Sequence, residues 1–176
     1  MIMNDEELDI LIRDYGQPMH RGFSKAIGID DNQLGGIGLC LPEYVEMTFL
    51  NLSLDEWRFR VTVSLNYNLS TKAQMMFMDV SLGLEDKEEI ESLVSIFKNK
   101  APHILLQPSV YKVKKRYYLR FSSQINNVEK EDLEKNVFNV FYQLTSGEMD
   151  KYNEPLFQLI EKKGIRKYES KSRKLD

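Results

Sequence analysis

Alternating apolar and polar residues mark one stretch of the chain most clearly. From position 57 to 67 the sequence reads WRFRVTVSLNY, in which every second residue is apolar. This alternation predicts a β-strand with one face on a core and the other toward solvent. Val61 and Val63 should point into the core, and Thr62 and Ser64 should face solvent. We interpret 57–67 as the central strand of an antiparallel sheet.

The segments on either side of this strand alternate in the same way. Residues 44–54 and 74–84 are joined to it by short segments rich in turn residues, which predicts a three-stranded antiparallel meander. In the first of them the apolar positions change phase after Phe49. A change of phase by one residue predicts a β-bulge at that point.

A second group of strands is predicted later in the chain. Residues 104–113 and 117–125 carry strand patterns, and Pro108 favours an edge position for the first of them. Lys114 and Lys115 lie between the two strands. We therefore place these lysines near the tip of a hairpin.

Apolar residues spaced three and four apart predict a helix at the start of the chain. Asn4 and Glu7 have the spacing of a capping box, and a leucine-rich face follows over 4–15. Gly16 and Pro18 are typical of a helix end, so we expect the helix to stop there.

Further helices are predicted over 86–97, 126–145 and 149–163 from the same spacing. Residues 165–176 are basic and have no periodic pattern, which indicates a disordered tail. The sequence thus predicts one α+β domain over 1–164. Its expected order is helix, three meander strands, helix, two strands and two helices.

The pattern is least regular between positions 17 and 41. We interpret 23–29 as a strand and 30–32 as a turn. Ile37, Leu39 and Leu41 would form the inward face of another strand. The glycines between 28 and 38 lack the spacing of a dinucleotide fingerprint or a P-loop, so a Gly-rich hairpin is the favoured interpretation.

Net charge, cysteine content and the length of apolar runs bear on the partners and the location that we expect for the protein. The 176 residues carry a net charge of −3, which gives no general preference for nucleic acid or anionic membranes. Cys40 is the single cysteine, so no intrachain disulfide can form. No apolar run is long enough to cross a membrane, and the first residues do not resemble a signal peptide. We therefore expect a cytoplasmic protein.

The sequence contains no recognisable catalytic pattern. His20 and His103, together with Cys40, do not supply a zinc-binding set. The acidic run 85–91 suits the first turn and solvated face of a helix better than a metal site. A Gly-x-Ser-x-Gly nucleophile elbow is absent from the sequence. We predict a non-enzymatic protein without a cofactor or metal.

The distribution of charge singles out one region. Between Ser92 and Val128 there are seven Lys and Arg residues and no Asp or Glu. Tyrosines are interleaved with five of these basic residues. The candidate partner-binding residues are Tyr111, Lys112, Lys114, Lys115, Arg116, Tyr118 and Arg120.

Three interpretations of this basic and aromatic hairpin remain open. Phosphate attraction and base stacking would hold single-stranded RNA. An acidic surface of a partner protein, or the acid-rich helices of this same chain, would fit equally well. Lysines at a hairpin tip also protect exposed strands from pairing with other chains, without any binding role.

The order of elements carries a resemblance to a known superfamily. It involves Leu8–Ile12 in the first helix, 74–84 leading into 86–97, and 119–125 leading into 133–144. In this layout the chain resembles the superfamily that joins type III secretion chaperones with the YbjN-like proteins. The chain departs from it by longer strands, by the Gly-rich insert at 28–38 and by the extra helix 149–163.

The resemblance implies a non-enzymatic module, usually a homodimer, that binds a segment of another protein along its sheet or helix faces. Chaperone-like or adaptor-like protein binding is therefore the favoured function. A small inhibitor of the immunity or antitoxin type is an alternative, since such proteins are also acidic and α+β. The single-stranded RNA-binding protein proposed from the hairpin is the other alternative.

Overall fold

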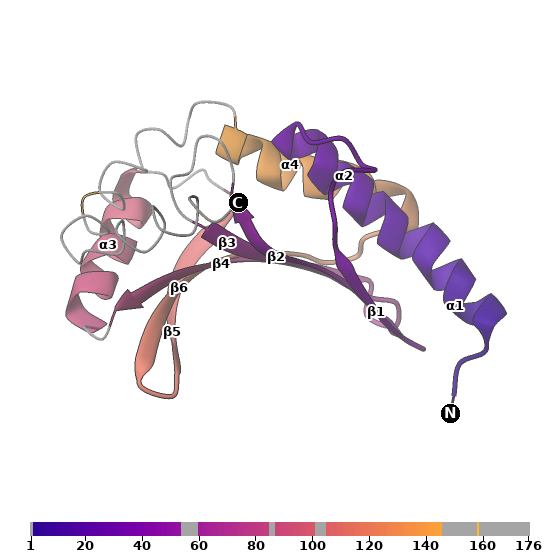
Figure 1. Cartoon of the computed structure of the whole chain (residues 1–176), viewed down its shortest axis with the longest axis horizontal. Helices are drawn as coiled ribbons and strands as arrows, with labels where there is room; N and C mark the ends of the chain where they lie inside the picture. The colour runs from indigo at the N-terminus through magenta and orange to yellow at the C-terminus, as the bar shows by residue number, and fades with distance from the viewer. Residues whose placement is uncertain (1, 54–59, 85–86, 101–104, 146–157, 159–176) are drawn as a thin grey trace, which may run out of the picture.

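The computed structural model describes residues 2–53, 60–84, 87–100, 105–145 and 158. These residues form an α+β domain, as predicted, with helices on one face of a six-stranded antiparallel sheet (Figure 1). The strands lie in the order β1-β2-β3-β4-β6-β5. They are β1 (Ile37–Leu41), β2 (Tyr44–Ser53), β3 (Arg60–Asn68), β4 (Ala73–Leu84), β5 (Gln107–Val113) and β6 (Arg116–Ile125). The helices are α1 (Asp5–Leu11), the π-helix η1 (Ile12–Gly16), α2 (Gln17–Ile27), α3 (Lys87–Lys100), the 3-10 helix η2 (Lys130–Asp132) and α4 (Leu133–Thr145).

The predicted meander is confirmed. Strand β3 pairs with β2 on one side and β4 on the other, both antiparallel. Val61 and Val63 are buried under the helices, whereas Thr62 and Ser64 point to the other face and are partly exposed. The expected bulge is present in β2, where the register shifts between Phe49 and Leu52. Residues 57–59 of the predicted strand lie outside the described residues.

The predicted end of the first helix is wrong. The capping box of Asn4 and Glu7 forms, but the chain stays helical through Gly16 and Pro18 to Ile27. At η1 the helix widens, and the Gln17 N–H donates to the Ile12 carbonyl five residues back. A π-turn of this kind loosens the backbone just before a proline that cannot donate. Pro18 then occupies the first turn of α2, a position that tolerates it.

The segment from 17 to 41 differs from its prediction in further ways. The expected strand 23–29 is the C-terminal half of α2, which ends at Gly28 in the left-handed conformation (φ 71°). The turn after Asp30 is confirmed, because the Asp30 carboxylate accepts from the Asn32 N–H at 2.9 Å. The glycines do not form a hairpin of their own. They lie in the connection from α2 to β1 and within β1 itself.

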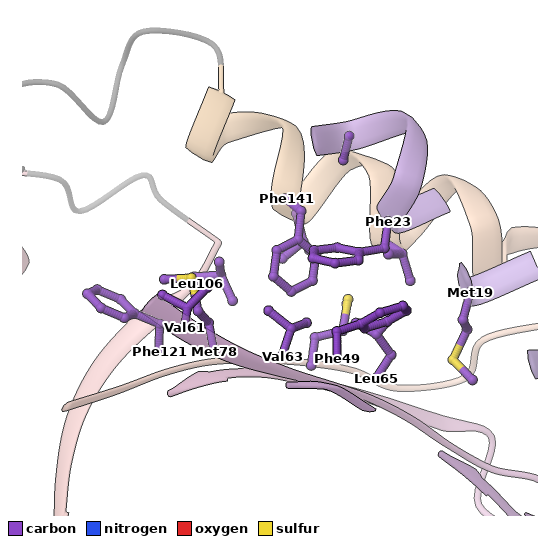
Figure 2. Close-up of a cluster of buried hydrophobic side chains, with 14 of the residues drawn as sticks. Met19, Phe23, Phe49, Val61, Val63, Leu65, Met78, Leu106, Phe121 and Phe141 are labelled. Atoms are coloured by element: carbon purple, nitrogen blue, oxygen red, sulfur yellow. The ribbon is translucent and has the colours of Figure 1, made fainter. Parts of the chain in front are cut away.

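The core lies between the sheet and the helices α2 and α4 (Figure 2). Phe23 of α2 contacts Phe49 of β2 with tilted rings and meets Phe141 of α4 edge-on, with ring centroids 4.7 and 4.9 Å apart. The two helices approach closely at Gly22, where an added Cβ would lie 2.3 Å from the Glu134 carbonyl oxygen. This small residue lets both helices reach the same face of the sheet.

The predicted edge strand is confirmed, since β5 is the last strand of the sheet and carries Pro108. Apart from position 158, the predicted helix 149–163 and the tail 165–176 lie outside the described residues, as does His103. The helices in the described ranges are all too short or too polar to span a lipid bilayer.

Candidate binding surface

The sheet has a second face that no described segment covers. Figure 1 shows the sheet curving away from the helices, with nothing described beneath it. We call this side the open face and the side under the helices the closed face. On the open face, residues that pair across neighbouring strands form rows. Glu46, Asn66, Met75 and Gln124 form one row, and Thr48, Ser64, Phe77 and Ser122 form the next.

The centre of the open face is held together by hydrogen bonds to one carboxylate. The Tyr44 hydroxyl donates to Glu46 Oε2 at 2.8 Å, and the Thr48 hydroxyl donates to Glu46 Oε1 at 2.8 Å. Ser64 adds a third hydroxyl at 3.2 Å from Oε1. Burial, with the hydrogen bond to Glu46, raises the pKa of Tyr44 to about 12. These groups therefore satisfy one another within the sheet.

A second polar unit lies on the same face between β4 and β6. The Arg120 guanidinium donates to both carboxylate oxygens of Asp79, at 2.7 and 2.8 Å. The guanidinium also lies over the rings of Phe77 and Tyr111, at 4.7 and 4.5 Å from their centroids. The hydrogen bond to Asp79 raises the pKa of Arg120. The positive charge of Arg120 is thus neutralised inside the sheet.

The structure separates the candidate residues of the hairpin. Tyr111 and Tyr118 face each other on the open face, with stacked rings 5.3 Å apart. Lys112 belongs to the opposite side of β5, where its amine lies 5.3 Å from the centre of the Tyr117 ring. Lys114 and Lys115 form the exposed turn.

The two arginines among the candidate residues are Arg116 and Arg120. The side chain of Arg116, which begins β6, lies outside the described part of the structure. Arg120 shares the open face with the two tyrosines but is paired with Asp79. The structure therefore brings together Tyr111, Tyr118 and Arg120, and leaves the lysines at the margin.

The prediction missed the most exposed apolar residues of the open face. Ile37, Leu39 and Leu41 of β1 were expected to point inward, but they are 60%, 50% and 51% exposed. Leu39 lies opposite Glu46, which places it on the open face. Leu50 of β2 lies between the pairs Phe49–Val63 and Leu52–Val61, in the interval of the open-face residue Thr62, and is 56% exposed. Alternation in the sequence indicated that the three β1 residues share a face, but it did not indicate which face.

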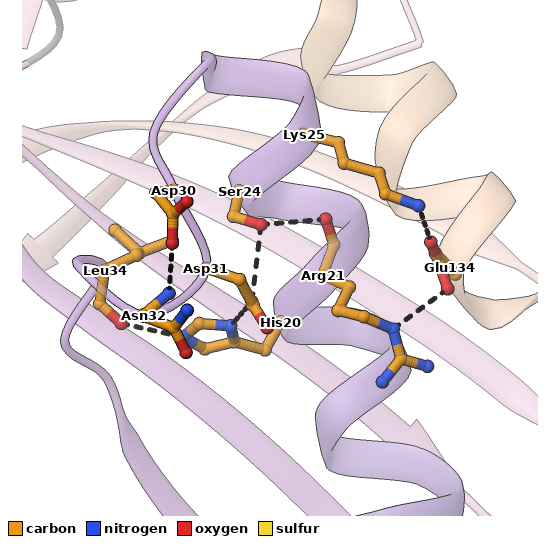
Figure 3. A network of polar contacts seen from close by, with 9 residues as sticks. All are labelled: His20, Arg21, Ser24, Lys25, Asp30, Asp31, Asn32, Leu34 and Glu134. Carbon is orange, nitrogen blue, oxygen red and sulfur yellow. Dashed lines mark hydrogen bonds and ion pairs between the residues drawn. The ribbon is translucent and has the colours of Figure 1, made fainter.

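A cluster on the helical side contains the residue types of a hydrolase triad, and its geometry does not form one (Figure 3). His20 Nδ1 contacts the Asp31 carboxylate, and His20 Nε2 lies 2.8 Å from the Leu34 carbonyl oxygen. Ser24 Oγ donates to the Arg21 carbonyl at 3.0 Å and lies 3.3 Å from Asp31. Both ring nitrogens of His20 contact oxygen atoms of other residues, Nδ1 that of Asp31 and Nε2 that of Leu34. The histidine is therefore not placed to take a proton from Ser24. The cluster fastens the connection after α2 to the helix.

Charged pairs join the two covering helices beside this cluster. Arg21 Nε and the Lys25 amine of α2 both reach the carboxylate of Glu134 in α4. The hydrogen bond from Lys25 contributes most to lowering the pKa of Glu134. These pairs support the close contact at Gly22.

No protein-family model, no curated protein and no solved structure matches the chain. In the ranges that the structure describes, no three His, Cys, Asp or Glu side chains converge on a metal-binding position.

Proposed function

We propose that this chain is a non-enzymatic, chaperone-like or adaptor-like module that binds a segment of a partner protein on the open face of its sheet. One observation carries the proposal. The open face exposes apolar side chains at its β1–β2 side, with the stacked pair Tyr111 and Tyr118 near its other edge. Clusters of exposed apolar and aromatic residues on a sheet are typical of protein-contact surfaces.

The stability of the domain does not require these exposed residues. The closed face already packs large side chains such as Phe49, Met76 and Met78 at 0% exposure. Leu50 at 56% exposure adds little to this core. A partner that covered the open face would bury such side chains, and each would then contribute roughly 1–2 kcal/mol. Aromatic residues such as Tyr118 offer contact area at a small cost in conformational entropy.

Charge favours an acidic protein segment over a nucleic acid. Lys114 and Lys115 stand free of the sheet at the hairpin tip and can attract an acidic partner from a distance. Arg120 is the cation nearest to the stacked tyrosines, and its guanidinium already holds Asp79. An RNA backbone bound across this face would have to compete with that carboxylate. Among the described residues, the site beside the stacked tyrosines therefore lacks an unpaired cation at its centre that could bind a phosphate group.

The test is quantitative capture of partners from the native host, followed by titration of the recovered partner against purified variants. Leu50→Ser and Tyr118→Ala alter the open face away from β1. Tyr142→Ser alters an aromatic residue of α4 that is 50% exposed, and it serves as the control. We expect each open-face variant to weaken binding by roughly 5- to 30-fold, and Tyr142→Ser to leave it within about twofold.

A triple variant separates the contribution of charge. Replacing Lys114, Lys115 and Arg116 by Ser should slow association and flatten its dependence on salt. Circular dichroism should show an unchanged fold for every variant. Unaltered binding by both Leu50→Ser and Tyr118→Ala would overturn the proposal. Recovery of single-stranded RNA in place of a protein, with loss on the triple variant, would overturn it in favour of the nucleic-acid interpretation.

A further inference from the structure

We infer that β1 pairs in an antiparallel arrangement with β1 of a second copy of this chain, about a two-fold axis at Leu39. The two sheets would then join edge to edge into one continuous sheet. This inference goes beyond the proposed function, because it concerns the free backbone edge of β1 and commits to a defined partner. Its evidence is the contrast between the two edges of the sheet and the symmetry of the β1 sequence.

The edge at β1 lacks the features that normally prevent edge pairing. Exposed edge strands are usually protected by lysine, by proline or by inward-pointing charges. Strand β5, at the other edge, has Pro108 and Lys112 within it. Strand β1 reads IGLCL and contains no charged residue and no proline. Among the described strands, only β2 pairs with it.

The hairpin geometry indicates which backbone groups β1 presents at its free side. Pro42 and Glu43 form a two-residue connection, so the hairpin closes at the pair Leu41 and Tyr44. Residues flanking such a connection form a hydrogen-bonded pair, and this state alternates along the strand. The N–H and C=O groups of Gly38 and Cys40 therefore point away from β2. Their side chains are absent or small, which permits close approach of another backbone.

The sequence of β1 is complementary to itself about Leu39. In antiparallel pairing around this residue, Gly38 meets Cys40 of the second copy and exchanges hydrogen bonds with it. Leu39 meets its own equivalent in a pair without hydrogen bonds, where side chains are closest. Ile37 meets Leu41 of the second copy, so every pair on the open face is apolar. A two-fold interface requires this kind of self-match, and no charges of the same sign oppose each other.

Pairing would also reduce the exposure of the apolar β1 residues on the open face. Ile37, Leu39 and Leu41 are between 50% and 60% exposed in one copy, and each would gain an apolar neighbour across the axis. The contact is short, so we expect a reversible dimer whose population increases with protein concentration. The open faces of the two copies would lie on the same side of the joined sheet.

The first test measures molar mass by light scattering after size-exclusion chromatography over a range of concentrations. The mass should rise from the 20.7 kDa of one chain toward twice that value. Leu39→Lys should remain monomeric at every concentration, because two lysines would meet on the axis. Val113→Lys is the matched control, since Val113 is 46% exposed on the opposite edge strand. This control should dimerise like the wild type.

The second test measures the register by oxidation of engineered cysteines in a Cys40→Ser background. Leu39→Cys should form an intermolecular disulfide, because the two positions face each other within the usual Cα separation. Ile37→Cys should not, because its equivalents are four residues apart along the strands, roughly 13 Å. A wild-type monomer at all concentrations would overturn the inference. So would a dimer that survives Leu39→Lys, or equal cross-linking at both positions. None of these changes affects Tyr118 or Leu50, so partner binding is tested separately.

Discussion

The two faces of the sheet carry similar side chains that differ in burial, and strand β4 shows this most directly. Met76 and Met78 lie on the closed face at 0% exposure, in contact with the core. Met75 and Phe77, which alternate with them, lie on the open face and are partly exposed. Residue type alone therefore does not separate core from surface in this strand. The helices decide it, because they cover one face and leave the other open.

The faces also differ in how their polar groups are satisfied. On the closed face, Gln74 is buried and donates to the Leu133 carbonyl at 3.2 Å. On the open face, Glu46 accepts from Ser64 and Asp79 accepts from Arg120, in each case across two adjacent strands. Stability thus depends mainly on packing on the closed face, and the centre of the open face is stable without a covering layer. This difference predicts that substitutions on the closed face will lower the free energy of unfolding more than substitutions on the open face.

The largest effect is expected from a charge on the closed face. Val63→Asp would bury an unpaired carboxylate in the middle of the sheet and should lower the free energy of unfolding by about 3–5 kcal/mol. Thr62→Asn, at the next position and on the open face, should change it by no more than about 1 kcal/mol. Urea denaturation followed by circular dichroism measures both. Equal losses would show that the two faces do not differ as described.

A somewhat smaller effect is expected where the helices meet. In Gly22→Ala the new methyl group would lie 2.3 Å from the Glu134 carbonyl oxygen, so α2 and α4 must move apart. We expect a net loss of roughly 1–2 kcal/mol, because the overpacking exceeds the gain in helix propensity. Gly35→Ala is the control, since no atom lies within 4 Å of the added group. An unchanged thermal midpoint for Gly22→Ala would contradict the close contact.

The closed face was predictable from sequence because its signal is local. Alternation around Val61 and Val63 fixes a strand and its buried side, and the predicted meander follows from short turns. The N-terminal helix was predicted to end too early, because Gly16 and Pro18 are common helix terminators. The π-turn that precedes Pro18 packs against β2, where Met47 Sδ lies 3.5 Å from the position of a Cβ on Gly16. Local sequence does not report that contact.

The open face was less predictable because its properties depend on pairs distant in sequence. The hairpin was predicted from its strand patterns and is confirmed, whereas its selection as a binding surface stays a prediction. The neutralising partner of Arg120 is Asp79, 41 positions earlier, and only the strand order β4-β6 brings them together. The orientation of Leu39 likewise follows from its register with Glu46. Charge and exposure on this face are therefore tertiary properties.

The Arg120–Asp79 pair should contribute modestly to stability. Its side chains are 35% and 22% exposed, so solvent screens part of the attraction. A double-mutant cycle with Arg120→Gln and Asp79→Asn should give a coupling energy of about 1 kcal/mol in chemical denaturation. A coupling near zero would mean that Arg120 is available to an external anion, which would strengthen the nucleic-acid alternative.

The smallest effect at neutral pH is expected from Tyr44. Its pKa is raised from 10.0 to about 12 in the folded chain, so its neutral form is favoured by folding. That contribution is complete below pH 10 and is lost as the pH rises toward 12. Absorbance titration should show a tyrosine that ionises about two pH units late, and Tyr44→Phe should remove that step. Titration of every tyrosine near pH 10 would contradict the partly buried hydrogen bond from Tyr44 to Glu46.

Oxidative footprinting of β4 tests whether the partner binds the open face, because one strand supplies both the probe and its controls. In the protein alone, hydroxyl radicals should oxidise Met75 readily and leave Met76 and Met78 largely unmodified. With the captured partner bound, oxidation of Met75 should fall several-fold, while the two buried methionines should not change. Undiminished oxidation of Met75 in the complex, together with protection of Tyr142 on α4, would place the partner on the helices. That result would contradict binding on the open face.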